Sequence, residues 1–126
     1  MADLKGTPTQ IPLNEECSAV IRNNLPSKLK DPGSIIIPCV VGKFSISRAL
    51  CDLGPSVTIM PLSLCRNLNI GEPKSINISL QLADLSIIYP EGILEDIPIK
   101  VGEFYVPCDI IILEMEEDSQ IPIILG

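Results

Sequence analysis

The sequence contains no histidine and no tryptophan, and it has only two tyrosines and two phenylalanines among 126 residues. Without histidine, the chain cannot build a Ser-His-Asp or Cys-His catalytic centre or supply imidazole ligands to zinc. If the chain hydrolyses a substrate, carboxylates must carry out the proton transfers. Because aromatics are so few, we expect the core to consist of Ile, Leu and Val.

Cysteine pairs at C-x-x-C spacing are also absent, and the five cysteines are an odd number. This pattern argues against a disulfide framework and against a zinc ribbon. We expect reduced thiols and an intracellular protein, cytoplasmic or nuclear and not secreted. A cysteine nucleophile would lack its usual histidine partner. The N-terminus has no apolar signal segment and no apolar run is long enough to span a membrane, so we expect no membrane association.

Basic residues are scarce in the second half of the chain, where residues 51–126 carry three basic and twelve acidic groups. An acidic domain fits the phosphate backbone of nucleic acids poorly, so we expect no direct nucleic acid binding. The net charge of −7 serves solubility. The acidic run at 114–118 lacks the spacing of a calcium loop, and no glycine-rich phosphate loop is present. We expect neither a metal nor a cofactor.

The pattern of apolar residues divides the chain into an extended leader at residues 1–33 and one domain at residues 34–126. The leader is interrupted by prolines, and its stretch 15–24 can form a short helix. From residue 34, short apolar runs alternate with turn residues, which indicates β-strands. A second helix is predicted at 62–68, after Pro61.

A weak internal repeat links IPCVVGKF at residues 37–44 with IPIKVGEF, 60 residues later. Five of the eight positions are identical. Each copy has a glycine between two apolar runs, which predicts a β-hairpin. Two readings remain open: unrelated hairpins with similar turn chemistry, or two β-units related by a pseudo-twofold axis.

Two Asp-x-Gly motifs are candidates for a carboxylate site. Asp52 follows the apolar run Ala49–Cys51 and precedes Gly54, so a carboxylate lies at the end of a predicted buried strand. Burying a carboxylate is costly unless it is hydrogen-bonded or paired, and the glycine permits a tight turn that brings amide donors to it. An ordinary turn aspartate is the other interpretation. The rival, Asp31, stands beside a proline outside any apolar run, which is typical of a plain turn.

The blocks ALCDLGPSV, LQLADLSIIYPEG and IPIILG occur in this order along the chain. Together with the upstream LPSKLKDPGSIIIPCVVG, they resemble the protease region of plant gypsy-type LTR-retrotransposon (gag-pol) polyproteins. The resemblance spans roughly residues 12–126. It implies a mostly β, retropepsin-like (acid protease) half-barrel with an internal pseudo-twofold repeat and one short helix.

The resemblance also implies three groups of site residues. The catalytic residue is Asp52, in an active-site loop formed by Leu53, Gly54, Pro55 and Ser56. The flap tip that closes over the substrate is formed by Ala83, Asp84, Leu85 and Ser86. The residues that support the catalytic loop are Ile123, Ile124, Leu125 and Gly126.

The implied activity is that of an aspartic endopeptidase that cleaves its own polyprotein or another peptide as a homodimer. Each copy supplies one Asp52, and the two carboxylates share a proton because like charges at close range cannot both ionise easily. One carboxylate then activates a water while the other protonates the peptide carbonyl, which favours mildly acidic pH. The alternative is a catalytically inactive retropepsin-like domain that serves as a dimerisation or binding module.

Three departures from the family bear on this choice. Leu53 stands where retroviral proteases have Thr or Ser, whose hydroxyl braces the aspartates, although plant elements often read Asp-Leu-Gly. Pro55 replaces the more usual alanine. The family continues past Gly126 with R-P-F-L and a short helix, so the resemblance predicts a domain truncated at its C-terminus.

Overall fold

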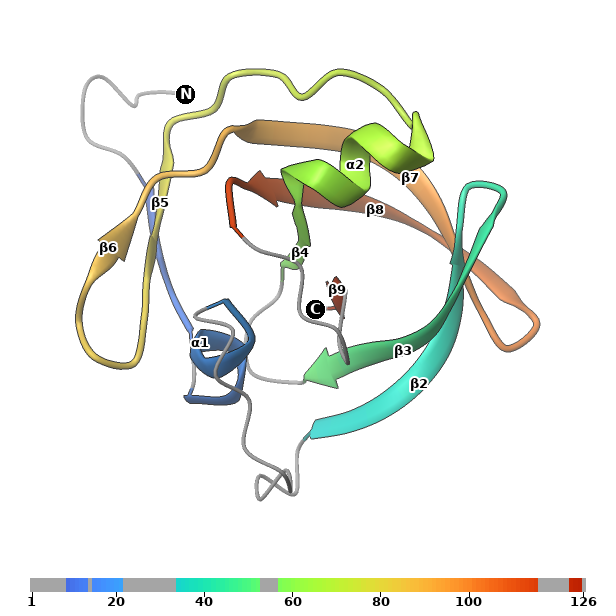
Figure 1. Ribbon diagram of the computed structural model, residues 1–126, viewed down its shortest axis with the longest axis horizontal. Coiled ribbons are helices and arrows are strands. Elements are labelled where there is room, and N and C mark those ends of the chain that lie inside the picture. The colour runs from blue at the N-terminus through green and yellow to red at the C-terminus, as the bar shows by residue number, and fades with distance from the viewer. Residues whose placement is uncertain (1–8, 14, 22–33, 53–56, 116–122, 126) are drawn as a thin grey trace.

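A computed structural model describes residues 9–13, 15–21, 34–52, 57–115 and 123–125 of the chain, within which two helices and nine strands form (Figure 1). In chain order the elements are β1 (Thr9–Pro12), α1 (Glu15–Ile21), β2 (Ser34–Val41), β3 (Phe44–Asp52), β4 (Thr58–Pro61), α2 (Leu62–Leu68), β5 (Ile78–Gln81), β6 (Ile87–Ile88), β7 (Gly92–Val101), β8 (Phe104–Leu113) and β9 (Ile123–Leu125). The mostly β class is as predicted. The described part has two helices where the resemblance implied one.

Six strands close into a barrel in the order β2-β3-β9-β4-β8-β7, with β7 pairing back onto β2. Exchanging β2 with β7, β3 with β8 and β4 with β9 reverses this order but keeps every pair of neighbouring strands. The barrel therefore consists of two units, β2-β3-β4 and β7-β8-β9. The third strand of each unit pairs in parallel with the second strand of the other. The short strands β4 and β9 thus close what was predicted as a half-barrel.

The repeated octapeptides form the turns of the two long hairpins, β2–β3 and β7–β8. Gly42 and Gly102 begin these turns with φ of 61° and 62°, a conformation that glycine adopts without steric cost. Between the hairpins, Val40 pairs with Lys100, and these are equivalent positions of the repeat. A twofold axis between the two hairpins would bring equivalent residues opposite each other in an antiparallel pair, as is observed here. The structure therefore favours the pseudo-twofold reading of the repeat.

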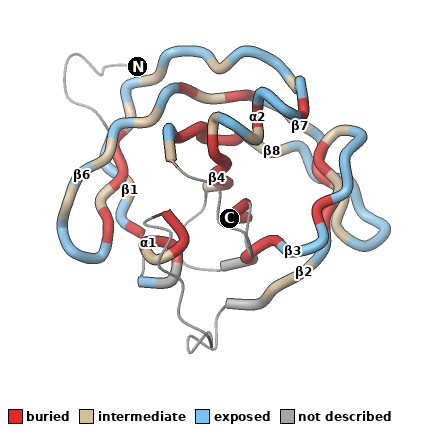
Figure 2. The backbone as a smooth tube through the Cα atoms, viewed as in Figure 1, coloured by how far each residue is buried: buried red, intermediate tan, exposed pale blue. Residues whose placement is uncertain are grey.

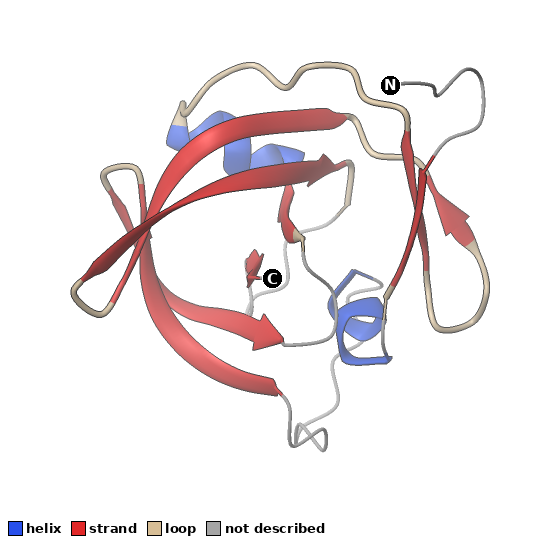
Figure 3. Cartoon of the chain, turned by 180° about the vertical axis from the view of Figure 1, so that it is seen from behind, coloured by secondary structure: helices blue, strands red, loops and turns tan. Residues whose placement is uncertain are grey.

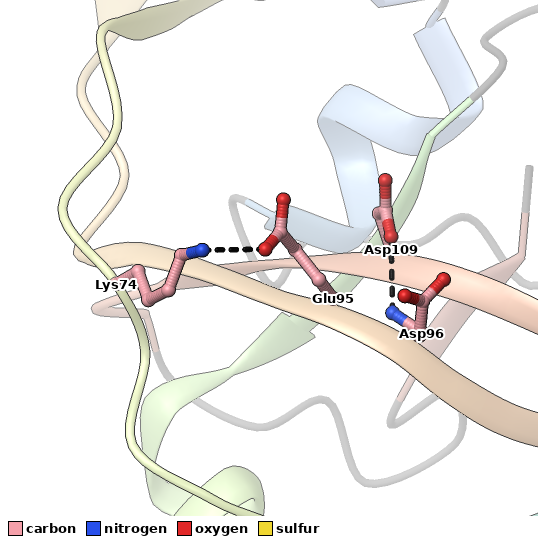
Figure 4. Close-up of polar contacts among 4 residues, drawn as sticks. All are labelled: Lys74, Glu95, Asp96 and Asp109. Carbon is pink, nitrogen blue, oxygen red and sulfur yellow. Dashed lines mark hydrogen bonds and ion pairs between the residues drawn. The ribbon is translucent and has the colours of Figure 1, made fainter.

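A bulge in β7 interrupts its pairing with β8 between Leu94 and Ile97. Asp96 takes a positive φ of 55° there, and its N–H donates to Asp109 Oδ1 at 3.1 Å. The neighbouring Glu95 pairs with Lys74 (Figure 4). The Asp109 carboxylate thus accepts a backbone hydrogen bond where the ladder is broken.

Helix α2 has the predicted bounds. Pro61 precedes it, and Asn69 ends it in the left-handed conformation, with φ of 53°. The Asn69 N–H donates to the carbonyls of Cys65 and Arg66 at 3.1 and 3.2 Å. Asn69 therefore caps the helix, two residues before Gly71. Neither helix of the described ranges is long and apolar enough to cross a membrane.

A three-stranded sheet, β1-β5-β6, lies beside the barrel (Figures 1 and 3). Its strand β1 comes from the predicted leader and runs parallel to β5. Helix α1 also comes from the leader and buries Cys17, Val20 and Ile21. The domain boundary at residue 34 stays a prediction, but the described part of the leader packs against the rest of the chain.

Two apolar clusters make up the core, and they consist of aliphatic side chains together with Cys and Met. Buried positions occur along the barrel strands and on α1 (Figure 2), and every residue of β4 and β9 is buried, so both faces of these two strands are covered. All four aromatic side chains are exposed, from 43% for Phe44 to 76% for Phe104. The prediction of an aliphatic core is confirmed for the described residues.

Candidate functional site

The predicted catalytic residue, Asp52, is the last residue of β3. Its backbone is opposite Ser34 of β2, so the aspartate lies where the long hairpin ends. Of Asp52 the structure describes the backbone only. The predicted loop residues Leu53, Gly54, Pro55 and Ser56 lie outside the described residues.

Strand β9 joins the two strands that flank this loop. It runs parallel to β3, with Leu50 opposite Ile124, and antiparallel to β4, with Ile59 opposite Ile124. All three of these side chains are fully buried. The predicted supporting residues Ile123, Ile124 and Leu125 therefore lie between the strand that leads to Asp52 and the strand that follows the loop. Gly126 lies outside the described residues.

The predicted flap tip is the turn of the β5–β6 hairpin. The Leu85 N–H donates to the Leu82 carbonyl, and the Leu82 N–H donates to the Ser86 carbonyl, both at 2.9 Å. Asp84 Oδ1 accepts hydrogen bonds from the Ser86 N–H at 3.0 Å and from its hydroxyl at 2.5 Å. Ala83, Asp84 and Leu85 are exposed and Ser86 is half-buried, and the role of these residues as a flap stays a prediction.

Leu85 is the unusual residue of this hairpin. Its φ is 71°, which is costly for a residue with a side chain. Its side chain is 72% exposed, so packing does not compensate for that conformation. A leucine placed in this way suits contact with another molecule better than it suits the stability of the free hairpin.

One apolar cluster joins the hairpin to the strands that flank the loop. Leu80 and Leu82 of the hairpin belong to it, as do Leu50, Ile59 and Ile124. The structure therefore brings together the hairpin, the strand that ends at Asp52, and β9. The sequence had predicted these elements separately.

Sequence reasoning missed the contribution of the N-terminal segment to this cluster. Leu13, Cys17, Val20 and Ile21 are buried in it. The signal was present: Cys17, Val20 and Ile21 have the i, i+3, i+4 spacing of an apolar helix face. Nothing in the local pattern, however, indicates which part of the domain that face covers.

A hollow of about 370 Å³ opens beside Val57, the first described residue after the loop. It lies between β5, β7 and β8, and its lining includes Ile78, Ile93 and Asp109. It offers a mainly apolar surface with one carboxylate next to the loop. Sequence reasoning did not identify this hollow, because its walls come from strands far apart in the chain.

Cys17, Cys39, Cys65 and Cys108 are free thiols. Desolvation, with a smaller effect of Cys108, raises the pKa of Cys39 to about 11 from its usual 9.0. Burial also raises the pKa of Cys65 and of Cys108. A reactive thiolate at neutral pH is therefore disfavoured at these three positions. Within the described ranges, no three Cys, Asp or Glu side chains come together as a metal site would need.

The raised pKa of Cys39 predicts that the protein loses stability in alkali. Between pH 9 and 11 the thiol ionises in the unfolded chain and stays neutral in the folded one. Ionisation therefore favours unfolding in this window. Under reducing conditions, we expect the free energy of unfolding to fall by about 2 kcal/mol more in the wild type than in Cys39→Ala between these pH values. Urea denaturation at each pH measures this, and parallel curves for the two proteins would contradict it.

Comparisons with known proteins support the fold. No model of a known protein family matches the chain, and no curated protein matches it. Among solved structures, the chain is similar to the retroviral protease-like domain of Ddi1 from Leishmania major, with a TM-score of 0.52 and 15% identity. The match covers 79% of this chain and 72% of that domain. The chain has a mostly β, retropepsin-like fold.

Proposed function

We propose that this chain is an aspartic endopeptidase in which two copies pair and each contributes Asp52 to one catalytic centre. A retropepsin-like fold with one Asp-x-Gly motif at the end of a barrel strand carries the proposal. Strand β9 supports it, because β9 holds the strands on both sides of the motif together. The absence of histidine supports it further, since carboxylates are then left to transfer protons.

The proposed chemistry needs no cofactor. The two Asp52 carboxylates share one proton and hold a water molecule between them. One carboxylate takes a proton from the water as the water oxygen attacks the peptide carbonyl carbon, and the other gives its proton to the carbonyl oxygen. The first carboxyl group then gives its proton to the amide nitrogen while the second takes a proton from a hydroxyl of the tetrahedral intermediate. The C–N bond breaks, and the dyad again holds one proton. The β5–β6 hairpin, with its tip at residues 83–86, closes over the extended substrate and limits access of bulk water.

The proposed context is a retrotransposon polyprotein of plant origin that this domain processes inside the cell. The sequence blocks ALCDLGPSV, LQLADLSIIYPEG and IPIILG support it. The other candidate is an inactive domain of the same fold that serves as a dimerisation or binding module. Leu53 favours it, because leucine cannot make the bracing hydrogen bonds of a Thr or Ser hydroxyl.

Cleavage of a peptide library across a pH series, read by mass spectrometry, tests the proposed activity. We expect cleavage between about pH 4 and 6 and a decline toward neutral pH, as a dyad that shares a proton requires. Sedimentation of the same sample reports whether the chain is a dimer. A dimer that cleaves nothing across the series would contradict the proposed enzyme and favour the binding module.

A further inference from the structure

We propose that the N-terminal segment made of β1 (Thr9–Pro12) and α1 (Glu15–Ile21) is an intramolecular latch: it fills a strand-addition site on the flap hairpin and has to be displaced before a peptide enters. The part of this inference that concerns substrate rests on the proposed function. The latch itself rests on contacts of β1 and α1 with the hairpin and with the strand that ends at Asp52.

The first contact is strand addition at the edge of β5. Strand β1 pairs in parallel with β5 along its whole length, from Thr9 opposite Ile78 to Pro12 opposite Gln81. The Leu13 N–H extends the pairing to the Gln81 carbonyl at 2.8 Å. Without β1, this edge would present the unpaired backbone groups to which extended peptides add. The chain therefore occupies its own peptide-binding edge.

The second contact is apolar and reaches the strand that ends at the catalytic position. Leu13, Cys17, Val20 and Ile21 pack in one cluster with Leu80 and Leu82 of the hairpin. The same cluster includes Leu50, two residues before Asp52. Helix α1 lies between the small sheet and the end of β3 in both views (Figures 1 and 3). The segment thus covers apolar surface shared by the hairpin and the strand that leads to the catalytic position.

The third contact holds the tip of the hairpin. The Ala83 N–H donates to Ser18 Oγ at 2.8 Å, although the two residues are 65 positions apart. Ser18 is 8% exposed, so water competes little for this bond. A flap that opens has to break it.

The size of the hairpin explains why a latch here can control it. Strands β5 and β6 span four and two residues. A two-stranded hairpin of this length is marginally stable in water, so a third strand decides whether it is ordered. An extended peptide paired with β5 could supply that strand in place of β1. Pairing of β5 with β1 and pairing of β5 with a peptide are then mutually exclusive.

The test compares two charge substitutions on opposite faces of β1 in the full chain. Ile11→Asp places a carboxylate on the face that packs against the cluster, whereas Gln10→Asp places the same charge at an exposed position. A second pair is Ser18→Ala, which removes the acceptor for the Ala83 N–H, and Ser47→Ala, which makes the same change at an exposed position of β3. Hydrogen exchange at residues 78–88 reports the flap, and exchange at 104–113 reports the barrel.

We expect flap exchange to rise about 2- to 10-fold in Ser18→Ala, which corresponds to the loss of one hydrogen bond, and to rise further in Ile11→Asp. Barrel exchange and both controls should match the wild type. We also expect a labelled peptide of residues 9–13 to bind Ile11→Asp more tightly than it binds the wild type. Unchanged flap exchange overturns the latch, and so does an equal rise in flap and barrel, because a latch has to open without unfolding the barrel.

Peptide cleavage by the same variants separates the latch from the proposed function. Faster flap exchange together with faster cleavage supports both. If flap exchange is faster but the protein cleaves no peptide, the latch is supported and the proposed protease activity is contradicted. The third outcome is that both latch variants show faster flap exchange but cleave peptide at the rate of the wild type. It would contradict the claim that the segment has to leave before a peptide enters.

Discussion

Asp52→Asn is expected to lower the rate of peptide cleavage by about 10²- to 10⁴-fold, the range over which a positioned acid–base group acts. The amide keeps the shape of the side chain but can neither accept the proton of the attacking water nor share a proton with its partner. Folding should be little changed, because the substitution is nearly isosteric. Peptide cleavage at the pH optimum, with thermal unfolding as the check on folding, measures this.

Asp31→Asn is the matched control for that substitution. Asp31 heads the other Asp-x-Gly sequence of the chain, so the same chemical change is made in the same local motif. We expect Asp31→Asn to cleave at the rate of the wild type. If Asp52→Asn also cleaved at that rate, Asp52 would not be the catalytic residue.

Ile124→Ala is expected to cost about 2–5 kcal/mol of folding stability, as large-to-small changes at fully buried positions do. Ile124 is opposite Leu50 on one side and Ile59 on the other, and it is fully buried. Truncation of this side chain leaves a cavity beside β9, the strand that joins the two units of the barrel. It also loosens the support of the strands around the Asp52 loop, so activity should fall along with stability.

Ile87→Ala provides the comparison for this loss. Ile87 lies on β6 with 39% of its surface exposed, so the same atoms are removed without a closed cavity. We expect it to cost less than about 1 kcal/mol in urea denaturation. If both substitutions lowered the free energy of unfolding equally, Ile124 would not be packed more tightly than Ile87.

Features with a local signal were predictable from the sequence. The two glycine turns and helix α2 were predicted at the positions where they occur, because hairpin and helix signals depend on neighbouring residues. The bulge in β7 had no such signal, because Glu95 and Asp96 interrupt the alternation of apolar and polar residues that indicates a strand.

Features that depend on contacts between distant residues were not predictable. Nothing in the pattern of residues 123–125 places them between β3 and β4, since that position depends on how the whole barrel closes. Likewise, residues 9–12 have no local property that selects β5 as a partner. The leader was therefore separated from the domain, although its apolar side chains pack against the hairpin and the strand that ends at Asp52.

A tandem fusion of two full chains joined by a flexible linker tests most directly whether two copies of the chain share one catalytic centre. The measurement is the cleavage rate of the fusion with Asp52→Asn in neither, one or both copies, at a dilution at which fusions do not associate. One substituted copy is expected to abolish activity as completely as two, because the carboxylates act as a pair. Retention of half the activity by the singly substituted fusion would contradict it, since each chain would then cleave peptides on its own.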